Sequence, residues 1–171
     1  MKLPEQLEVL VITLSDRAYK GEYEDLSGPR IKELVSEYFT SAGWDHTVNA
    51  TLIPDDATGF KELLKRASGI YDIIFTTGGT GIGSRDITVD TLSPLLSKEI
   101  PGIMELIRVK YGMENPNALL SRGVAGIIGK SLIYTLPGSV RAVEEYMTEI
   151  LKSLKHAIYM MYGIDSHTKH L

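Results

Sequence analysis

The chain has 171 residues, of which 43% are hydrophobic and 23% charged, and this is the size and composition of one ordinary soluble domain. Its net charge of −4 argues against a non-specific nucleic-acid binder, and the absence of cysteine excludes disulfides, thiolate catalysis and cysteine-ligated metals. No apolar run approaches the roughly 20 residues of a membrane span. The N-terminal apolar segment Leu7–Leu14 is short, contains Glu8 and follows Glu5, where a secretory signal would favour positive charge. We therefore expect a cytoplasmic protein without a membrane or nucleic-acid partner.

The first half of the chain alternates between strand-like and helix-like patterns. Residues 8–14 form a near-continuous apolar run, which predicts a strand buried on both faces, and residues 47–53 and 71–76 predict two more strands. Between these runs, apolar residues at helical spacing predict one helix that starts near Pro29 and a second helix over residues 60–67.

The second half has a less regular pattern. Residues 89–96 and 100–110 predict helices, and residues 115–130 have no clear period. Residues 131–136 predict a further strand, and residues 140–158 predict a long final helix with one apolar stripe.

Alternating strands and helices predict the α/β class, with a single domain built on a mostly parallel sheet that has helices on both faces. We expect this domain to span residues 1–162, with residues 163–171 forming a polar C-terminal tail.

A glycine-rich loop follows the strand predicted at residues 71–76. It contains Gly78, Gly79, Gly81 and Gly83 and ends in Arg85-Asp86. Glycines allow backbone N–H groups to approach an anion closely, and a carboxylate is a good magnesium ligand. The loop is neither a Walker loop nor a dinucleotide fingerprint, because it lacks the Lys-Ser/Thr ending of the first and the glycine spacing of the second. It therefore predicts a nucleotide–metal site of another kind.

Ligands of parallel α/β sheets bind beyond the carboxyl ends of the strands. Four of the predicted strands end in polar or glycine-containing segments, which are Ser15-Asp16, Pro54-Asp55-Asp56, the Gly78–Asp86 loop and Pro137-Gly138-Ser139. If these strands are parallel, Asp55 and Asp86 face one crevice from different loops. A magnesium-bridged phosphate needs one or two such carboxylates in addition to its own oxygens.

Each acidic residue also has a purely structural interpretation. Either Asp55 or Asp56 could cap the following helix, and we expect one to cap it and Asp55 to be the functional one. Asp16 could form an ordinary loop pair with the arginine that follows it.

The same question applies to the glycine loop. Asp86 could form only a local pair with Arg85, and Thr88 or Asp90 could cap the next helix. We favour a functional Asp86, because turn geometry alone does not require four glycines after one strand.

Several segments together resemble the molybdopterin adenylyltransferases of molybdenum-cofactor biosynthesis, in order and in spacing, over nearly the whole chain. The matching segments are Ser15-Asp16-Arg17-Ala18, Ser27-Gly28-Pro29, Ile53-Pro54-Asp55, Thr77-Gly78-Gly79-Thr80-Gly81, Arg85-Asp86-Ile87-Thr88, Glu99-Ile100-Pro101-Gly102, Leu120-Ser121-Arg122 and Leu136-Pro137-Gly138.

The resemblance implies a homotrimeric enzyme that binds molybdopterin, ATP and Mg²⁺ and transfers AMP to the terminal phosphate of molybdopterin, with release of pyrophosphate. A separate molybdenum-insertion protein would then use the product. By the same resemblance, Asp55 and Asp86 are the catalytic and metal-binding residues. The residues expected to bind substrate are Ser15, Asp16, Gly78, Gly79, Thr80, Gly81, Arg85, Ser121, Ser131, Pro137 and Gly138.

Two alternatives stay open from the sequence. The first is a non-catalytic pterin-binding or scaffolding member of the same fold family. The second is a nucleotide-cleaving enzyme similar to the pyrophosphatase-like relatives, which the short chain disfavours.

Overall fold

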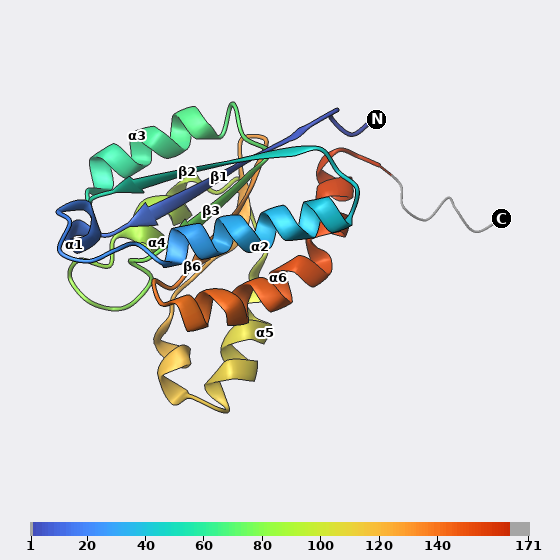
Figure 1. Ribbon diagram of the computed structural model, residues 1–171. Helices are drawn as coiled ribbons and strands as arrows, with labels where there is room; N and C mark the ends of the chain where they lie inside the picture. Colours follow the sequence, from blue (N-terminus) through green and yellow to red (C-terminus); the bar gives the residue numbers. More distant parts are fainter. Residues whose placement is uncertain (1, 165–171) are drawn as a thin grey trace.

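The predicted strands form the centre of one six-stranded sheet in the computed structural model, which describes residues 2–164 (Figure 1). The strands are β1 (Leu7–Leu14), β2 (His46–Ile53), β3 (Ile73–Thr77), β4 (Lys98–Glu99), β5 (Ala125–Ile128) and β6 (Ser131–Leu136). Their order across the sheet is β2-β1-β3-β6-β5-β4. Strands β2, β1, β3 and β6 are parallel, whereas β5 runs antiparallel to both β6 and β4.

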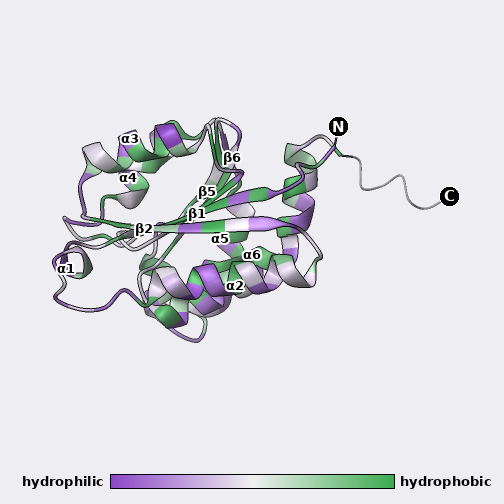
Figure 2. Ribbon diagram, turned by 45° about the horizontal axis from the view of Figure 1, so that its top comes forward, coloured by the Kyte–Doolittle hydropathy of each residue, from purple (hydrophilic) through white to green (hydrophobic). Residues whose placement is uncertain are grey.

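Helices cover both faces of this sheet. They are α1 (Asp16–Tyr19), α2 (Ser27–Ser41), α3 (Ala57–Ala67), α4 (Thr88–Leu92), α5 (Pro101–Gly112) and α6 (Val140–Met161), with short 3₁₀ turns η1 (Ser93–Leu95) and η2 (Pro116–Leu120). Figure 2 shows α3 and α4 on one side of the sheet and α2, α5 and α6 on the other. The predicted architecture is therefore confirmed.

The central strands are apolar throughout because their side chains alternate between two cores. Val9, Val11 and Phe75 face the core that contains residues of α2, α5 and α6. Leu10 and Ile12 belong to the core that contains residues of α3 and α4. All five side chains are buried, so both layers of helices are anchored on the same strands.

Several details differ from the sequence predictions, and two of them have a clear physical reason. The helix expected over residues 89–96 is divided into α4 and η1, because Pro94 has no N–H group to continue an α-helix. The unpatterned stretch 115–130 contains η2 and β5. Strand β5 was missed because it is short and lies in the antiparallel part of the sheet, next to the edge strand β4. Gly126 allows the two strands to approach closely, since a Cβ there would lie 2.3 Å from the Lys98 carbonyl oxygen.

Between residues 2 and 164, no helix is long and apolar enough to cross a membrane. Most of the tail expected at 163–171 lies outside the described residues. Of that segment, Gly163 and Ile164 are described, and their N–H groups donate to the last turn of α6.

A mostly buried carboxylate joins α5 to α6. Glu149, whose side chain is 5% exposed, accepts a hydrogen bond from Lys110 Nζ at 2.6 Å and one from Lys152 Nζ at 2.8 Å. The hydrogen bond from Lys110, followed by that from Lys152, lowers the pKa of Glu149 below its usual value. The charged form of Glu149 is therefore the one that stabilises the contact between the two helices.

We predict that Glu149→Gln destabilises the protein by about 1–2 kcal/mol at neutral pH, because the charge-assisted hydrogen bonds are lost. The folded pKa lies below the unfolded value of about 4.3, so this stabilisation is present above that pH and disappears as the pH falls through the folded pKa. Urea unfolding of both proteins between pH 7 and pH 3 measures it. A difference that does not shrink in acid would contradict this interpretation.

Candidate functional site

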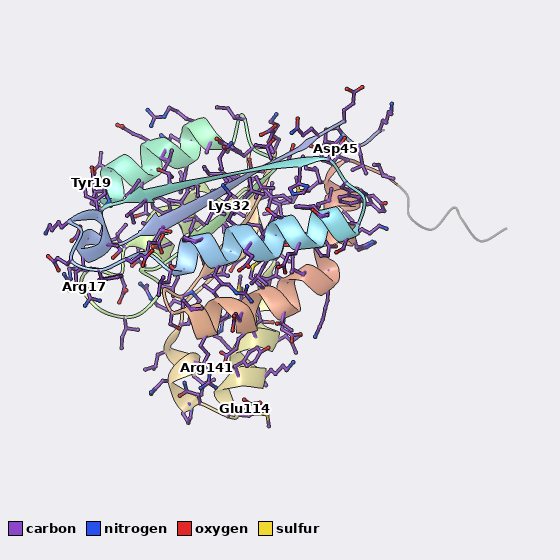
Figure 3. The ribbon with its side chains drawn as sticks, viewed as in Figure 1. Arg17, Tyr19, Lys32, Asp45, Glu114 and Arg141 are labelled. Atoms are coloured by element: carbon purple, nitrogen blue, oxygen red, sulfur yellow. The ribbon has the colours of Figure 1, made fainter. Side chains whose placement is uncertain are left out.

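A cleft of about 550 Å³ lies at the edge of the sheet where β1, β2, β3 and β6 end. Its walls come from the segments after these strands, as the sequence predicted. The lining includes Ser15, Asp16, Arg17, Tyr23, Asp55, Gly78, Gly79, Arg85, Asp86, Gly138 and Ser139. Figure 3 shows Arg17 at this end of the sheet and Asp45 at the opposite end, where β2 begins. The parallel strands thus bring residues from four separate segments to one place.

Asp16 and Asp55 are joined by reciprocal hydrogen bonds. The Asp16 N–H donates to Asp55 Oδ2 at 3.1 Å, and the Asp55 N–H donates to Asp16 Oδ1 at 3.0 Å. Each carboxylate thereby fixes the other's loop and keeps its second oxygen without a hydrogen-bond partner among the described residues. The arrangement presents two close negative charges to the cleft, which attracts cations.

Asp56, rather than its neighbour Asp55, caps helix α3. Its side chain accepts hydrogen bonds from Thr58 N–H at 3.2 Å and Gly59 N–H at 2.9 Å, and it caps α3. Asp55 lines the cleft instead. The expectation that one aspartate caps the helix is confirmed, with Asp56 as the cap.

The glycine loop is held at its base by Thr88. Gly78 and Gly79 have φ angles of +95° and +63°, which disfavour other residues. The buried Thr88 donates from Oγ1 to the Gly78 carbonyl at 2.8 Å and from its N–H to the Gly79 carbonyl at 3.1 Å. The N–H groups of Gly79, Thr80 and Gly81 have no acceptor within residues 2–164 and remain available to an anion.

Asp86 is oriented by the loop that carries it. Its Oδ2 accepts a hydrogen bond from Gly83 N–H at 2.7 Å. A Cβ at Gly81 would lie 2.8 Å from the same oxygen, so the carboxylate occupies the space that glycine leaves. Within the part of the chain that the structure describes, Asp86 forms no ion pair with Arg85 or another cation. The local-pair interpretation of Asp86 is therefore not supported.

Asp90 and Thr88 do not cap α4. Ile87 is the N-cap residue and makes no side-chain hydrogen bond, Thr88 closes the loop, and Asp90 pairs with Arg122.

Ser15 and Tyr23 form one wall of the cleft. The Ser15 hydroxyl accepts the Ala18 N–H at 3.2 Å, which caps α1, and lies 2.7 Å from the Tyr23 hydroxyl. Arg17 lies over the Tyr23 ring, with its guanidinium carbon 5.1 Å from the ring centre. Sequence reasoning missed Tyr23 as a residue of the site. The signal that could have found it is an aromatic residue in the polar segment between β1 and α2.

A second recess of about 350 Å³ shares Gly79, Asp86 and Gly138 with the main cleft. In this recess the Tyr146 hydroxyl donates to Ser121 Oγ at 2.9 Å. Burial raises the pKa of Tyr146, so the phenol stays protonated and remains a donor at neutral pH. Thr80, Gly81, Pro137 and Arg141 also line the recess.

One expected residue lies elsewhere. Ser131 begins β6, beside the start of β3, and is fully buried. Its hydroxyl donates to the Tyr71 carbonyl oxygen. The structure does not bring Ser131 to the candidate site, because the cleft lies at the carboxyl ends of the strands and Ser131 lies at an amino end. The sequence held a signal against a substrate-binding role for Ser131: it is the first residue of the strand predicted at 131–136, and the site was expected at the end of that strand.

No group of three or more His, Cys, Asp or Glu side chains in the described part of the chain could hold a metal ion. The oxygens of Asp16, Asp55 and Asp86 nevertheless are hard donors that suit Mg²⁺, which commonly takes one or two carboxylates together with phosphate oxygens. The residues present therefore fit a magnesium ion that a phosphorylated ligand helps to bind.

Comparisons with known proteins agree with this geometry. Residues 10–156 match the family model described as "Probable molybdopterin binding domain". The chain is 39% identical over 163 residues to molybdenum cofactor biosynthesis protein B of Staphylococcus carnosus, covering 93% of each chain. It is 35% identical over 159 residues to the molybdopterin adenylyltransferase of Helicobacter pylori, covering 92% of this chain and 89% of the relative. The solved structure of the tungsten cofactor synthesizing protein MoaB from Pyrococcus furiosus is 34% identical, covers 93% of this chain and 99% of its own, and superposes with a TM-score of 0.78.

We predict that Gly78→Ala destabilises the protein by about 3 kcal/mol or more, because the added Cβ meets both an unfavourable φ and a backbone contact. That Cβ would lie 2.3 Å from the Leu14 carbonyl oxygen. Gly102→Ala is the control, since a Cβ there has open space and should be neutral or stabilise α5 by about 0.5–1 kcal/mol. Denaturant unfolding compares the two, and equal stabilities would refute the proposed close approach.

Proposed function

The chain belongs to the molybdopterin-binding domain family, and we propose that it transfers AMP from ATP to the terminal phosphate of molybdopterin, giving adenylylated molybdopterin and pyrophosphate. The observation that carries this proposal is the meeting of Asp16, Asp55 and Asp86 in a cleft beside the free N–H groups of the glycine loop. The relative named molybdopterin adenylyltransferase, which matches over 92% of this chain, supports it.

The reaction needs positioning and charge neutralisation more than covalent help from the protein. An oxygen of the molybdopterin phosphate attacks the α-phosphorus of ATP, and the bond to the pyrophosphate oxygen breaks. The N–H groups of Gly79, Thr80 and Gly81 are free to donate to phosphate oxygens as negative charge builds up on them. Arg17 and Arg85 add positive charge to the lining of the same cleft.

Magnesium fits the unpaired carboxylate oxygens at this site. Asp55 and Asp86 would hold the ion together with oxygens of the triphosphate, in the manner that Mg²⁺ adopts with nucleotides. When bound, the ion supplies positive charge that offsets the charge of the phosphates. The reciprocal hydrogen bonds between Asp16 and Asp55 keep the Asp55 carboxylate directed into the cleft before any ligand arrives.

The two connected recesses provide one place for each substrate. The triphosphate occupies the larger cleft beside Asp16, Asp55 and Arg17. The pterin occupies the smaller recess with Ser121 and the Pro137-Gly138 turn. Gly79 and Asp86 line both, so the attacking phosphate and the α-phosphate meet there.

We predict that Asp86→Asn and Asp55→Asn each lower the rate of adenylylation by about 100-fold or more, because the site loses a negative ligand for the metal. Asp56→Asn is the matched control: asparagine also caps helices, and the residue lies beside Asp55. The assay follows adenylylated molybdopterin and pyrophosphate from molybdopterin, ATP and Mg²⁺.

Unchanged turnover in Asp86→Asn would exclude its role in metal binding. Molybdopterin binding by the wild-type protein without any product would instead favour the non-catalytic, pterin-binding alternative.

The proposed assembly is a homotrimer, and its product passes to a separate protein that inserts the metal. A reaction that consumes ATP is consistent with the cytoplasmic location expected from the sequence. Five apolar residues in or directly beside α5 and η2 offer a surface for assembly, because they are more than half exposed and lie at the margin of the molecule (Figure 1). They are Leu106, Val109, Met113, Leu119 and Leu120.

We predict a solution mass about three times the 18.9 kDa of one chain. Val109→Glu should reduce this mass, because a charge on an apolar interface is costly to bury. Met160→Glu on α6 is the control, since Met160 is similarly exposed but lies on another helix. Sedimentation at micromolar concentration measures all three proteins, and a wild-type mass of one chain would exclude the trimer.

A further inference from the structure

Arg122 holds the glycine loop from outside the cleft. It follows η2, and its guanidinium crosses to the loop and to α4. Nε donates to the Gly81 carbonyl at 2.8 Å, and Nη2 donates to the Asp86 carbonyl at 3.2 Å. Nη1 and Nη2 also form a two-point ion pair with Asp90, at 2.8 and 2.9 Å. The main-chain N–H of Arg122 also donates a hydrogen bond to the Thr80 carbonyl, at 2.8 Å.

The loop has few other attachments near Asp86. Residues 82–85 are exposed. The hydrogen bonds that Gly83 and Arg85 make stay inside the loop, to Asp86 and Ile87. Thr88 fixes the base of the loop, at Gly78 and Gly79. Arg122 alone, within residues 2–164, ties the carbonyls on both sides of the exposed stretch to a distant part of the chain.

Arg122 itself lines neither the main cleft nor the second recess. Arg122 therefore acts without contacting a substrate, through its bonds to the loop or through its charge near Asp86, and Arg122→Lys separates these two because it keeps the charge. The Asp86 main chain is one of its acceptors, so a shift of Arg122 changes where the Asp86 carboxylate lies relative to Asp16 and Asp55.

We propose that Arg122 is a positioning residue for adenylyl transfer, which clamps the Gly81 and Asp86 carbonyls so that the Asp86 carboxylate stays in the cleft. This inference rests on the proposed function. The planar guanidinium suits the task because its donors diverge in a fixed fork that reaches two carbonyls and a carboxylate together. A lysine at this position presents a single point charge and cannot reproduce that geometry.

A purely structural role makes a different prediction. The Arg122–Asp90 pair is partly exposed, at 37% and 67%, and such pairs contribute little to stability. If only that ion pair mattered, Asp90→Asn and Arg122→Gln would have the same small effect. If the carbonyl clamp matters, Asp90→Asn is mild, because Arg122 keeps its bonds to Gly81 and Asp86.

The test measures steady-state kinetics, thermal stability and amide hydrogen exchange for Arg122→Gln, Arg122→Lys and Asp90→Asn. Arg30→Gln is the matched control, because Arg30 also pairs with two carboxylates, Glu33 and Glu144, and is also partly exposed.

In Arg122→Gln we expect kcat to fall by about 10- to 100-fold, since a small displacement of a catalytic group has effects of this size. The KM for ATP should change less than about threefold, because the group acts mainly on the transition state. Arg122→Lys should lose most of the same activity, and Asp90→Asn should lose less than about threefold. The Tm should match that of Arg30→Gln, with faster exchange confined to residues 80–87.

Three outcomes would overturn the inference. They are a kcat within about threefold of wild type in Arg122→Gln, an equal loss in Asp90→Asn, or faster exchange throughout the protein. If the wild-type protein forms no adenylylated product, the proposed function fails. The exchange comparison still tests the clamp in that case, because it needs no turnover.

Discussion

Parallel pairing of β2, β1, β3 and β6 is the constraint on which the site depends. Parallel strands all end at the same edge, so the segments that follow them meet even where they are far apart in the chain. Asp16 and Asp55 are separated by 39 positions, yet the backbone N–H of each donates to the carboxylate of the other, because β1 and β2 pair in register up to Leu14 and Ile53. A shift in that register would separate the two carboxylates and open the wall of the cleft.

Close packing of backbone against backbone is the second requirement at this edge. Gly78 passes so near the Leu14 carbonyl that no side chain fits, and Gly138 lies next to Gly78, where an added Cβ would be 3.4 Å from the Gly78 Cα. These contacts fix the start of the glycine loop, whereas Gly81 leaves room for the Asp86 carboxylate. The glycines therefore serve two purposes: some bring the segments together, and Gly81 positions a functional group.

The electrostatics of the cleft follow from this arrangement. Three carboxylates and two arginines line the same cleft, beside the free N–H groups of the glycine loop. Under the proposed function, a cation together with phosphate oxygens would balance the negative charge of these carboxylates. Arg122 does not line the cleft. Its guanidinium donates hydrogen bonds to carbonyls of the glycine loop, so it supports the shape of the site without occupying the space of a ligand.

The sequence by itself determined the four parallel strands, the helices with apolar stripes, the edge of the sheet that carries the cleft and the place of the glycine loop there. These follow from local periodicity and from the chemistry of neighbouring residues, which a chain displays without being folded. Tertiary structure decided that Asp56 caps α3 while Asp55 lines the cleft, and that Ser131 lies in β6 away from the cleft. It also decided the role of Arg122, whose bond to Gly81 spans 41 positions. Such contacts depend on strand direction and on side-chain reach across the fold, and local sequence patterns specify neither.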